Sequence, residues 1–289
     1  MHFVAGIIDK CSSEVVTTFT ENLSNWSGSQ GYCVEIGDGV SDSWTMPMLE
    51  QVKNISELSE GYNIVGLSQG TLIGRGVVEL CDGAPPVKNF ISVGGVHAGI
   101  ASIPFCGSER ICALLDQLIE SMVYTDWVQD ISAYLEGCKF LPKLNNEINA
   151  TRNSTYKERF ASLQNLVLIM FEQDTVLVPK ETSWFGYYPD GAFYPVLPAQ
   201  ETLLYTEDWI GLKILDEAGK VKFINVSGGH LEISTSDMKT YIVPYLEDET
   251  SRQVVITETS PFNWLSSIWH FFLELIGFSK DQPLLRMVD

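Results

Sequence analysis

The alternation of short apolar runs with helical stretches is the feature of this sequence that most restricts its fold. The apolar runs Tyr62–Leu67 and Val87–Val93 lie on either side of residues 71–81, which have helical spacing. Two further apolar runs, Asn165–Phe171 and Val221–Val226, come later in the chain. Short β-rich runs that alternate with helices are typical of a mostly parallel sheet covered by helices. The sequence therefore predicts an α/β fold with a mostly parallel central sheet.

The stretch Gly66-Leu67-Ser68-Gln69-Gly70 has the pattern G-x-S-x-G and joins the first of these strands to the helix after it. In such a sharp turn the glycines relieve crowding, and the serine is lifted above the edge of the sheet. The residue after the serine offers its backbone N–H to an oxyanion. We therefore predict Ser68 as a nucleophile and Gln69 as an oxyanion-hole donor, with a chance serine in a tight turn as the alternative.

A serine becomes a useful nucleophile only when a base accepts its proton. His230 follows the run Val221–Val226 through a flexible Ser-Gly-Gly stretch, which places it at the same edge of the sheet as Ser68. Triads of the α/β-hydrolase class run serine, acid, histidine in chain order. His230 is therefore the predicted base. The other histidines are less suitable by their place in the chain: His2, His97 and His270.

Asp174 is the predicted acid, because it follows the buried run Asn165–Phe171 and lies between Ser68 and His230 in the chain. Its task is to accept the imidazole N–H and to stabilise the imidazolium ion. Glu172 is the nearest alternative.

A second oxyanion-hole donor is expected besides Gln69. It normally comes from the loop after an early strand, which here is residues 6–9, and we choose Ile7. The aromatic stretch 184–188 either lines an acyl pocket or belongs to the ordinary core, and the core is favoured. A triad of this kind needs no cofactor or metal, and the six cysteines and four histidines do not have zinc-finger spacing.

A chain of 289 residues is long enough for one sizeable core, and α/β domains of this length are commonly single. We assign residues 1–247 to one α/β-hydrolase domain, with its end taken from the resemblance described below. Residues 98–164 alternate helical pieces with polar loop, and we interpret them as a helical insertion over the active site, with ordinary crossover helices as the alternative. The tail, residues 248–289, contains an apolar stretch at 262–278. This stretch either packs on the body, which is favoured, or lies on a membrane surface.

Charge and sequons restrict the partners and the compartment. A net charge of −19 repels phosphate backbones, so nucleic acid is not an expected partner. Six asparagines begin N-x-[ST] sequons, whereas roughly two are expected by chance. This excess indicates a secretory-pathway protein, although residues 1–8 do not resemble a signal peptide. Asn225 lies in a strand-like run, where we expect it to be buried. The remaining candidates for glycosylation are Asn22, Asn25, Asn54, Asn149 and Asn153.

Several longer stretches resemble the core of the palmitoyl-protein thioesterases: residues 61–70, 91–99, 183–186 and 200–213, continuing to 229–231. The resemblance covers roughly residues 6–247 and implies a glycoprotein of the lysosome or vacuole, or an extracellular one. It implies removal of fatty acyl groups from cysteine thioesters by Ser68, Asp174 and His230. It also implies a disulfide between Cys106 and Cys112, while the pairing of Cys11, Cys33, Cys81 and Cys138 stays open.

One stretch departs from the family pattern. Family members carry His-Gly-x-Gly-Asp after the first strand, whereas this chain has Ala5-Gly6-Ile7-Ile8-Asp9. A β-branched residue in such a tight loop distorts the second oxyanion donor. Loss of one donor lowers the rate on the order of 10²–10³-fold.

The leading hypothesis is a serine thioesterase that hydrolyses palmitoyl thioesters of S-acylated proteins through an acyl-enzyme. A lipid carboxylester hydrolase is the second hypothesis, because a triad does not distinguish sulfur from oxygen esters. A hydrolase-like protein without useful turnover is the third, and the altered residues 5–9 favour it.

Overall fold

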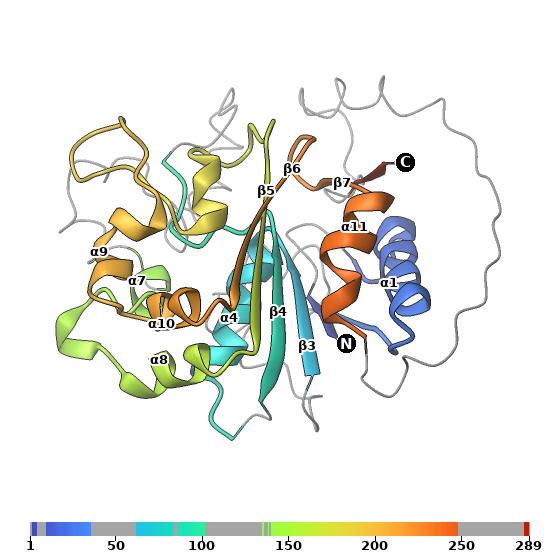
Figure 1. Cartoon of the computed structure of the whole chain (residues 1–289), viewed down its shortest axis with the longest axis horizontal. Helices are drawn as coiled ribbons and strands as arrows, with labels where there is room; N and C mark the ends of the chain where they lie inside the picture. Colours follow the sequence, from blue (N-terminus) through green and yellow to red (C-terminus); the bar gives the residue numbers. More distant parts are fainter. Residues whose placement is uncertain are drawn as a thin grey trace.

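The structure, a computed structural model, describes residues 2–4, 10–35, 62–83, 86–101, 135, 138, 140–247 and 286–288. Within these residues a single six-stranded sheet forms the centre of the molecule (Figure 1), and every neighbouring pair of its strands is parallel. The strands lie in the order β2 (Tyr32–Val34), β1 (His2–Val4), β3 (Tyr62–Leu67), β4 (Val87–Val93), β5 (Asn165–Phe171) and β6 (Val221–Val226). The predicted parallel α/β architecture is therefore confirmed, and the six strands of this sheet have their carboxyl ends at the same edge.

The four predicted strands β3 to β6 have the bounds that the sequence indicated. Every residue of β3 is buried, and so are all but the first of β5. Because successive side chains of a strand point to opposite faces, apolar residues throughout a strand mean that both faces are covered. The short strand β1, in contrast, has only three residues and was not predicted as a full strand.

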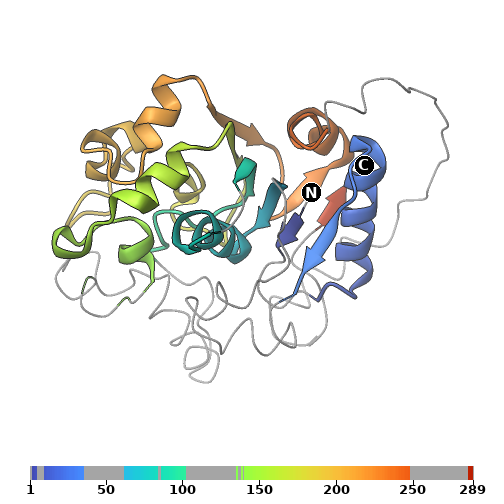
Figure 2. The ribbon, with the colours of Figure 1, turned by 90° about the horizontal axis from the view of Figure 1, so that it is seen from below.

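Helices cover both faces of the sheet (Figures 1 and 2). One face carries α4 (Gln69–Leu80), α7 (Leu141–Leu144), α8 (Ser154–Ala161), α9 (Leu203–Thr206) and α10 (Leu212–Glu217). The other face carries α1 (Glu14–Ser27) and α11 (Thr235–Tyr241). Each face has its own apolar core, with side chains such as Ile64 and Phe90 in the first and Val65 and Ile91 in the second. The described residues also contain four short 3-10 helices: η1 (Asn149–Thr151), η2 (Lys180–Trp184), η3 (Ala199–Glu201) and η4 (Val243–Tyr245).

The insertion was expected at residues 98–164, and its described part packs beside α4. Its helices α7 and α8 both contact α4, and the side chains of Phe140, Leu141 and Phe160 belong to the core on that face. α8 leads directly into β5, as a crossover helix does. Of residues 102–139, only 135 and 138 are described, so most of the helical pieces expected there lie outside the described residues.

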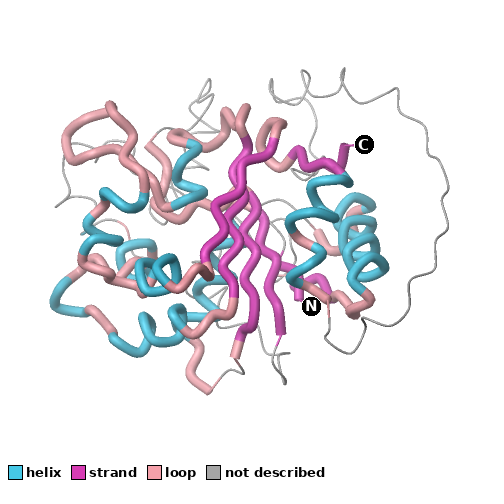
Figure 3. Tube along the Cα trace, in the orientation of Figure 1, coloured by secondary structure: helices cyan, strands magenta, loops and turns pink. Residues whose placement is uncertain are grey.

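The described end of the chain returns to the body of the protein. β8 (Arg286–Val288) pairs in parallel with β7 (Glu232–Ser234), which follows the loop of His230 (Figure 3). This strand was not predicted from sequence, because three residues are too short to show the alternation of a strand. The apolar stretch 262–278 lies outside the described residues. Among the helices that the structure describes, none is long and apolar enough to cross a membrane.

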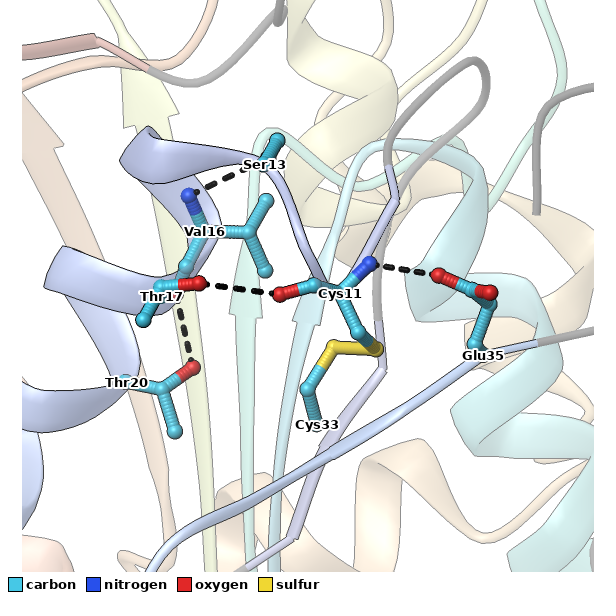
Figure 4. Close-up of a disulfide and its surroundings, with 7 residues drawn as sticks. All are labelled: Cys11, Ser13, Val16, Thr17, Thr20, Cys33 and Glu35. Carbon is cyan, nitrogen blue, oxygen red and sulfur yellow. Dashed lines mark hydrogen bonds between the residues drawn. A yellow bond between two sulfur atoms is a disulfide. The ribbon is translucent and has the colours of Figure 1, made fainter.

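A disulfide joins Cys11 to Cys33 and ties the start of α1 to β2 (Figure 4). Next to it, the backbone N–H of Cys11 donates to Glu35 at 2.6 Å, and Ser13 caps the first turn of α1. The sequence left this pairing open because Cys11 and Cys33 are 22 residues apart and meet only in the fold. The disulfide implied between Cys106 and Cys112 lies outside the described residues.

An ion pair is buried between α4 and its neighbours. Arg75 Nε lies 2.9 Å from Glu79 Oε1, and both side chains are 0% exposed. The guanidinium also donates to Asn145 Oδ1 at 2.9 Å and to the carbonyl of Leu144 at 3.2 Å, and it lies over the ring of Phe160. Burial raises the pKa of Glu79 to about 7, and this effect outweighs the charge and hydrogen bond of Arg75, which act to lower the pKa. The pair was not predicted from sequence.

We predict that Glu79→Ala lowers the free energy of unfolding by about 3–5 kcal/mol, because it leaves the Arg75 charge buried without its partner. The measurement is urea unfolding at pH 8, above the raised pKa of Glu79. The matched control is Glu217→Ala, which breaks the exposed Lys213–Glu217 pair of the same i,i+4 spacing. This control should change stability by less than about 1 kcal/mol. Equal effects of the two variants would contradict the prediction.

Removing the Cys11–Cys33 disulfide by a double serine substitution is expected to cost about 3 kcal/mol, because the bond restricts a loop of this length in the unfolded chain. Urea unfolding with and without a reductant tests this. The reductant should destabilise the wild type and leave the double variant unchanged, and a variant as stable as the oxidised wild type would disprove the claim.

Candidate active site

Ser68 lies in the sharp turn between β3 and α4 that the sequence predicted. Its backbone has φ 47° and ψ −120°, a strained conformation for a residue with a side chain. Gly66 permits the turn, because a Cβ on it would lie 2.8 Å from the Cα of Thr71. The N–H of Ser68 donates to the carbonyl of Val93 on β4 at 3.0 Å, and Thr71 Oγ1 donates to the Ser68 carbonyl at 2.6 Å. These contacts hold the serine at the carboxyl edge of the sheet.

His230 connects the serine to the acid. Its Nε2 lies 3.0 Å from Ser68 Oγ, and its Nδ1 lies 2.7 Å from Asp174 Oδ2. The side chains of His230 and Asp174 are 3% and 0% exposed, so water does not compete for this hydrogen bond. The three residues come from the ends of β3, β5 and β6 and form the chain serine, histidine, aspartate that general-base activation of a serine requires.

Asp174 is fixed by a turn of its own. Its second oxygen, Oδ1, accepts the backbone N–H groups of Val176 at 2.8 Å and Leu177 at 3.0 Å. Because Oδ1 is held by the backbone, Oδ2 remains directed at the imidazole. The carboxylate can therefore orient His230 and stabilise its protonated form.

Glu172, the alternative acid, has a different task. Its carboxylate accepts the amide of Asn225 at 2.8 Å and the hydroxyl of Ser227 at 3.2 Å, on the strand and loop that lead to His230. Asn225 is exposed, contrary to our expectation, because β6 is the edge strand of the described sheet. Next to Glu172, the Gln173 side chain accepts the N–H of Gly228 at 2.6 Å. The acid segment and the base loop are thus joined directly.

Of the remaining histidines, the structure describes the side chain of His97, which lies apart from Ser68 and Asp174. His97 is completely buried, and its Nε2 lies 2.7 Å from Ser92 Oγ. His2 is part of β1, and His270 lies outside the described residues. In the described part of the chain, histidine, cysteine, aspartate and glutamate side chains form no group of three or more that suits a metal ion.

One of the two predicted oxyanion donors lies in the described region. Gln69 follows Ser68 directly and is the first residue of α4, a helix of 12 residues whose N-terminal N–H groups and dipole favour a negative charge. Its role as a donor stays a prediction. Ile7, the second choice, lies outside the described residues.

The aromatic stretch 184–188 belongs in part to the core, as favoured from sequence. Phe185 is 1% exposed and stacks on the ring of His97, with centroids 4.4 Å apart. Trp184 is partly buried and donates its indole N–H to the carbonyl of Leu168 at 3.0 Å. Phe185 is therefore a core residue, whereas Trp184 packs against the core and stays partly exposed.

The chain is similar in sequence to known thioesterases. The chain matches the family described as palmitoyl protein thioesterase over residues 1–230. It is 42% identical over 207 residues to palmitoyl-protein thioesterase 1 of Caenorhabditis elegans, which covers 67% of this chain and 68% of the relative. It is 32% identical over 240 residues to palmitoyl-protein thioesterase 3 of Dictyostelium discoideum, with 74% and 81% covered. A lysosomal thioesterase of Xenopus laevis is 28% identical over 200 residues, with 65% and 68% covered.

We predict that Asp174→Asn slows the reaction of Ser68 with a fluorophosphonate probe by about 10³–10⁴-fold, because the amide favours the wrong tautomer of His230. The control Glu172→Gln should leave the rate within about tenfold of wild type, because its exposed hydrogen bonds contribute only about 1 kcal/mol each. Second-order labelling rates give the comparison. A slower Glu172→Gln than Asp174→Asn would reverse the assignment of the acid.

Proposed function

Because the chain belongs to the palmitoyl protein thioesterase family, we propose that it hydrolyses palmitoyl thioesters of S-acylated proteins and that Ser68, His230 and Asp174 carry out the reaction. The observation that carries this assignment is the hydrogen-bonded chain from Ser68 Oγ through His230 to Asp174. Such a chain converts a serine into a nucleophile toward an acyl carbonyl.

The first half of the reaction transfers the acyl group to Ser68. Ser68 Oγ attacks the thioester carbonyl while His230 Nε2, 3.0 Å away, takes its proton. The tetrahedral intermediate carries a negative oxygen, which the N–H of Gln69 stabilises, with Ile7 as the proposed second donor. When the intermediate collapses, the bond from carbon to sulfur breaks, His230 returns the proton, and the cysteine thiol of the substrate leaves.

The second half releases the fatty acid. Water gives a proton to His230 and attacks the acyl-Ser68 ester, and the collapse of the second intermediate restores the serine hydroxyl. Asp174 stabilises the imidazolium ion in both halves through the 2.7 Å hydrogen bond to Nδ1. The proposed steps use only side chains and backbone of this chain together with water.

We extend the proposal to the domain and the compartment. Residues 1–247 form the hydrolase domain, and the tail packs on this body, where its strand β8 pairs with β7. Asn25 and Asn149 are exposed, so they are accessible to glycans in the folded protein. Asn22 and Asn153 are only partly exposed, and the Asn22 amide donates to Met287 Sδ at 3.8 Å, whereas Asn54 lies outside the described residues. A disulfide and glycans suit an oxidising compartment. The lysosomal name of one relative supports a lysosomal location.

Hydrolysis of a lipid oxygen ester is the second candidate function, because the same triad can serve both esters. We predict that purified protein hydrolyses a palmitoyl thioester of a cysteine peptide faster than the matching serine oxygen ester, by comparison of kcat/KM. Ser68→Ala should abolish both reactions. Preference for the oxygen ester would support the second function, and folded wild-type protein that hydrolyses neither ester would contradict both.

A further inference from the structure

The turn after β4, residues 93–101, contacts all three segments that carry the triad, although none of its residues is part of the triad. β4 lies between β3 and β5 in the sheet, so the turn comes out directly between the nucleophile and the acid segments. The carbonyl of Val93 accepts the N–H of Ser68 at 3.0 Å, and the N–H of Gly94 donates to the carbonyl of Ile169 on β5 at 2.9 Å. The turn is thus joined to the backbone on either side of it.

The ring of His230 rests against the first glycine of this turn. A Cβ placed on Gly94 would lie 3.1 Å from His230 Cε1 and 3.4 Å from its Nδ1. Gly94 also has a φ of 59°, which favours glycine. The position of the Gly94 backbone therefore limits where the base can lie between Ser68 and Asp174.

The far side of the turn is joined to the segment that follows the acid. The N–H of Ala98 donates to Thr182 Oγ1 at 2.9 Å, and the N–H of Ala101 donates to the carbonyl of Val178 at 2.6 Å. A displacement of the turn would therefore reach the base through Gly94 and the acid segment through these two hydrogen bonds.

A buried histidine holds the turn in this position. His97 Nε2 lies 2.7 Å from Ser92 Oγ, which bridges the turn back to β4. Gly95 lies inside this bridge, where a Cβ would be 2.3 Å from Ser92 Oγ and 2.5 Å from His97 Nε2. On its other side the imidazole stacks on Phe185 with an interplanar angle of 7°, and the His97 carbonyl accepts the Asn145 amide at 3.1 Å.

The surroundings of His97 suit an uncharged ring. Its side chain is fully buried, and burial together with the nearby Arg75 charge holds its pKa well below the usual value. The bridge to Ser92 therefore does not depend on a charge that changes over the usual working range of pH.

We propose that His97 is a positioning residue of the active site, which holds the turn after β4 through Ser92 so that Gly94 supports the ring of His230. This inference rests on the proposed function of Ser68, His230 and Asp174. It assigns a role to a histidine that touches no reacting atom. The bridge acts on the geometry of proton transfer rather than on substrate binding, so its loss should lower kcat and leave KM nearly unchanged.

Two substitutions remove the bridge from opposite ends. Ser92→Ala removes the hydroxyl, and His97→Phe removes the ring nitrogen while it retains an aromatic ring against Phe185. We expect each to lower both kcat and the fluorophosphonate labelling rate of Ser68 by about 10–100-fold, the effect of a small displacement of a catalytic group. The double variant should be no slower than the slower single variant, because both remove the same interaction.

The control for loss of stability is Leu215→Ala, which opens the same core at α10, away from the turn. It should lower the melting temperature without changing the labelling rate of the folded protein. Should Ser92→Ala and His97→Phe behave as Leu215→Ala does, with lower melting temperatures but wild-type labelling rates, the positioning role is wrong. Additive losses of rate in the double variant would also overturn it.

The design separates this inference from the proposed function. If wild-type protein reacts with the probe but hydrolyses no palmitoyl thioester, the proposed substrate is wrong, while the labelling rates still test His97. If Ser68→Ala is labelled as fast as wild type, the triad assignment fails and the positioning role fails with it. A lower kcat for palmitoyl thioester hydrolysis in Ser92→Ala and His97→Phe, but not in Leu215→Ala, supports both the proposed function and the positioning role.

Discussion

The close approach of β3 to α4 at Ser68 is the constraint on which the rest of the site depends. The turn is possible because Gly66 has no Cβ, which would otherwise meet the Cα of Thr71 at 2.8 Å. In return, the turn holds Ser68 at a φ of 47° and presents its hydroxyl above the sheet edge. Such strain persists only when its surroundings hold it, and here the hydrogen bonds from Ser68 to Val93 and from Thr71 to Ser68 do so.

A parallel sheet is what brings the other two groups to this turn. All the neighbouring strands run in one direction, so residues far apart in the chain end at one edge. The triad residues follow β3, β5 and β6, and β4 lies between β3 and β5. The turn after β4 therefore passes close to the ring of His230, and the absence of a side chain on Gly94 leaves room for that ring. The edge strand β6 needs its own support, which Glu172 and Gln173 provide through the loop of His230.

Polar groups buried beneath α4 form a second level of support. Arg75, Glu79 and Asn145 are fully or almost fully buried, and Asn145 joins the guanidinium to the carbonyl of His97. Burial of charge costs free energy that the ion pair and its hydrogen bonds offset only when all partners are in place. A network of this kind therefore favours one packing of α4 and of the residues before α8 over many similar ones, and α4 begins directly after the nucleophile.

Local signals in the sequence determined much of this arrangement. The apolar runs have a period and length that define β3 to β6, and the glycines around Ser68 have a direct steric reason. The strands and the meeting of Ser68, His230 and Asp174 at one sheet edge were therefore predictable, whereas their catalytic roles stay a proposal. The choice between Asp174 and Glu172 was favoured by position, but only the fold shows which carboxylate faces His230. Other features depend on how separate segments meet in space, and they could not be predicted. They are the Cys11–Cys33 bond, the pairing of β8 with β7, the exposure of Asn225 and the bridge from His97 to Ser92. Periodicity reports the environment of one element at a time, whereas these features arise where elements meet, and only the tertiary structure decides that.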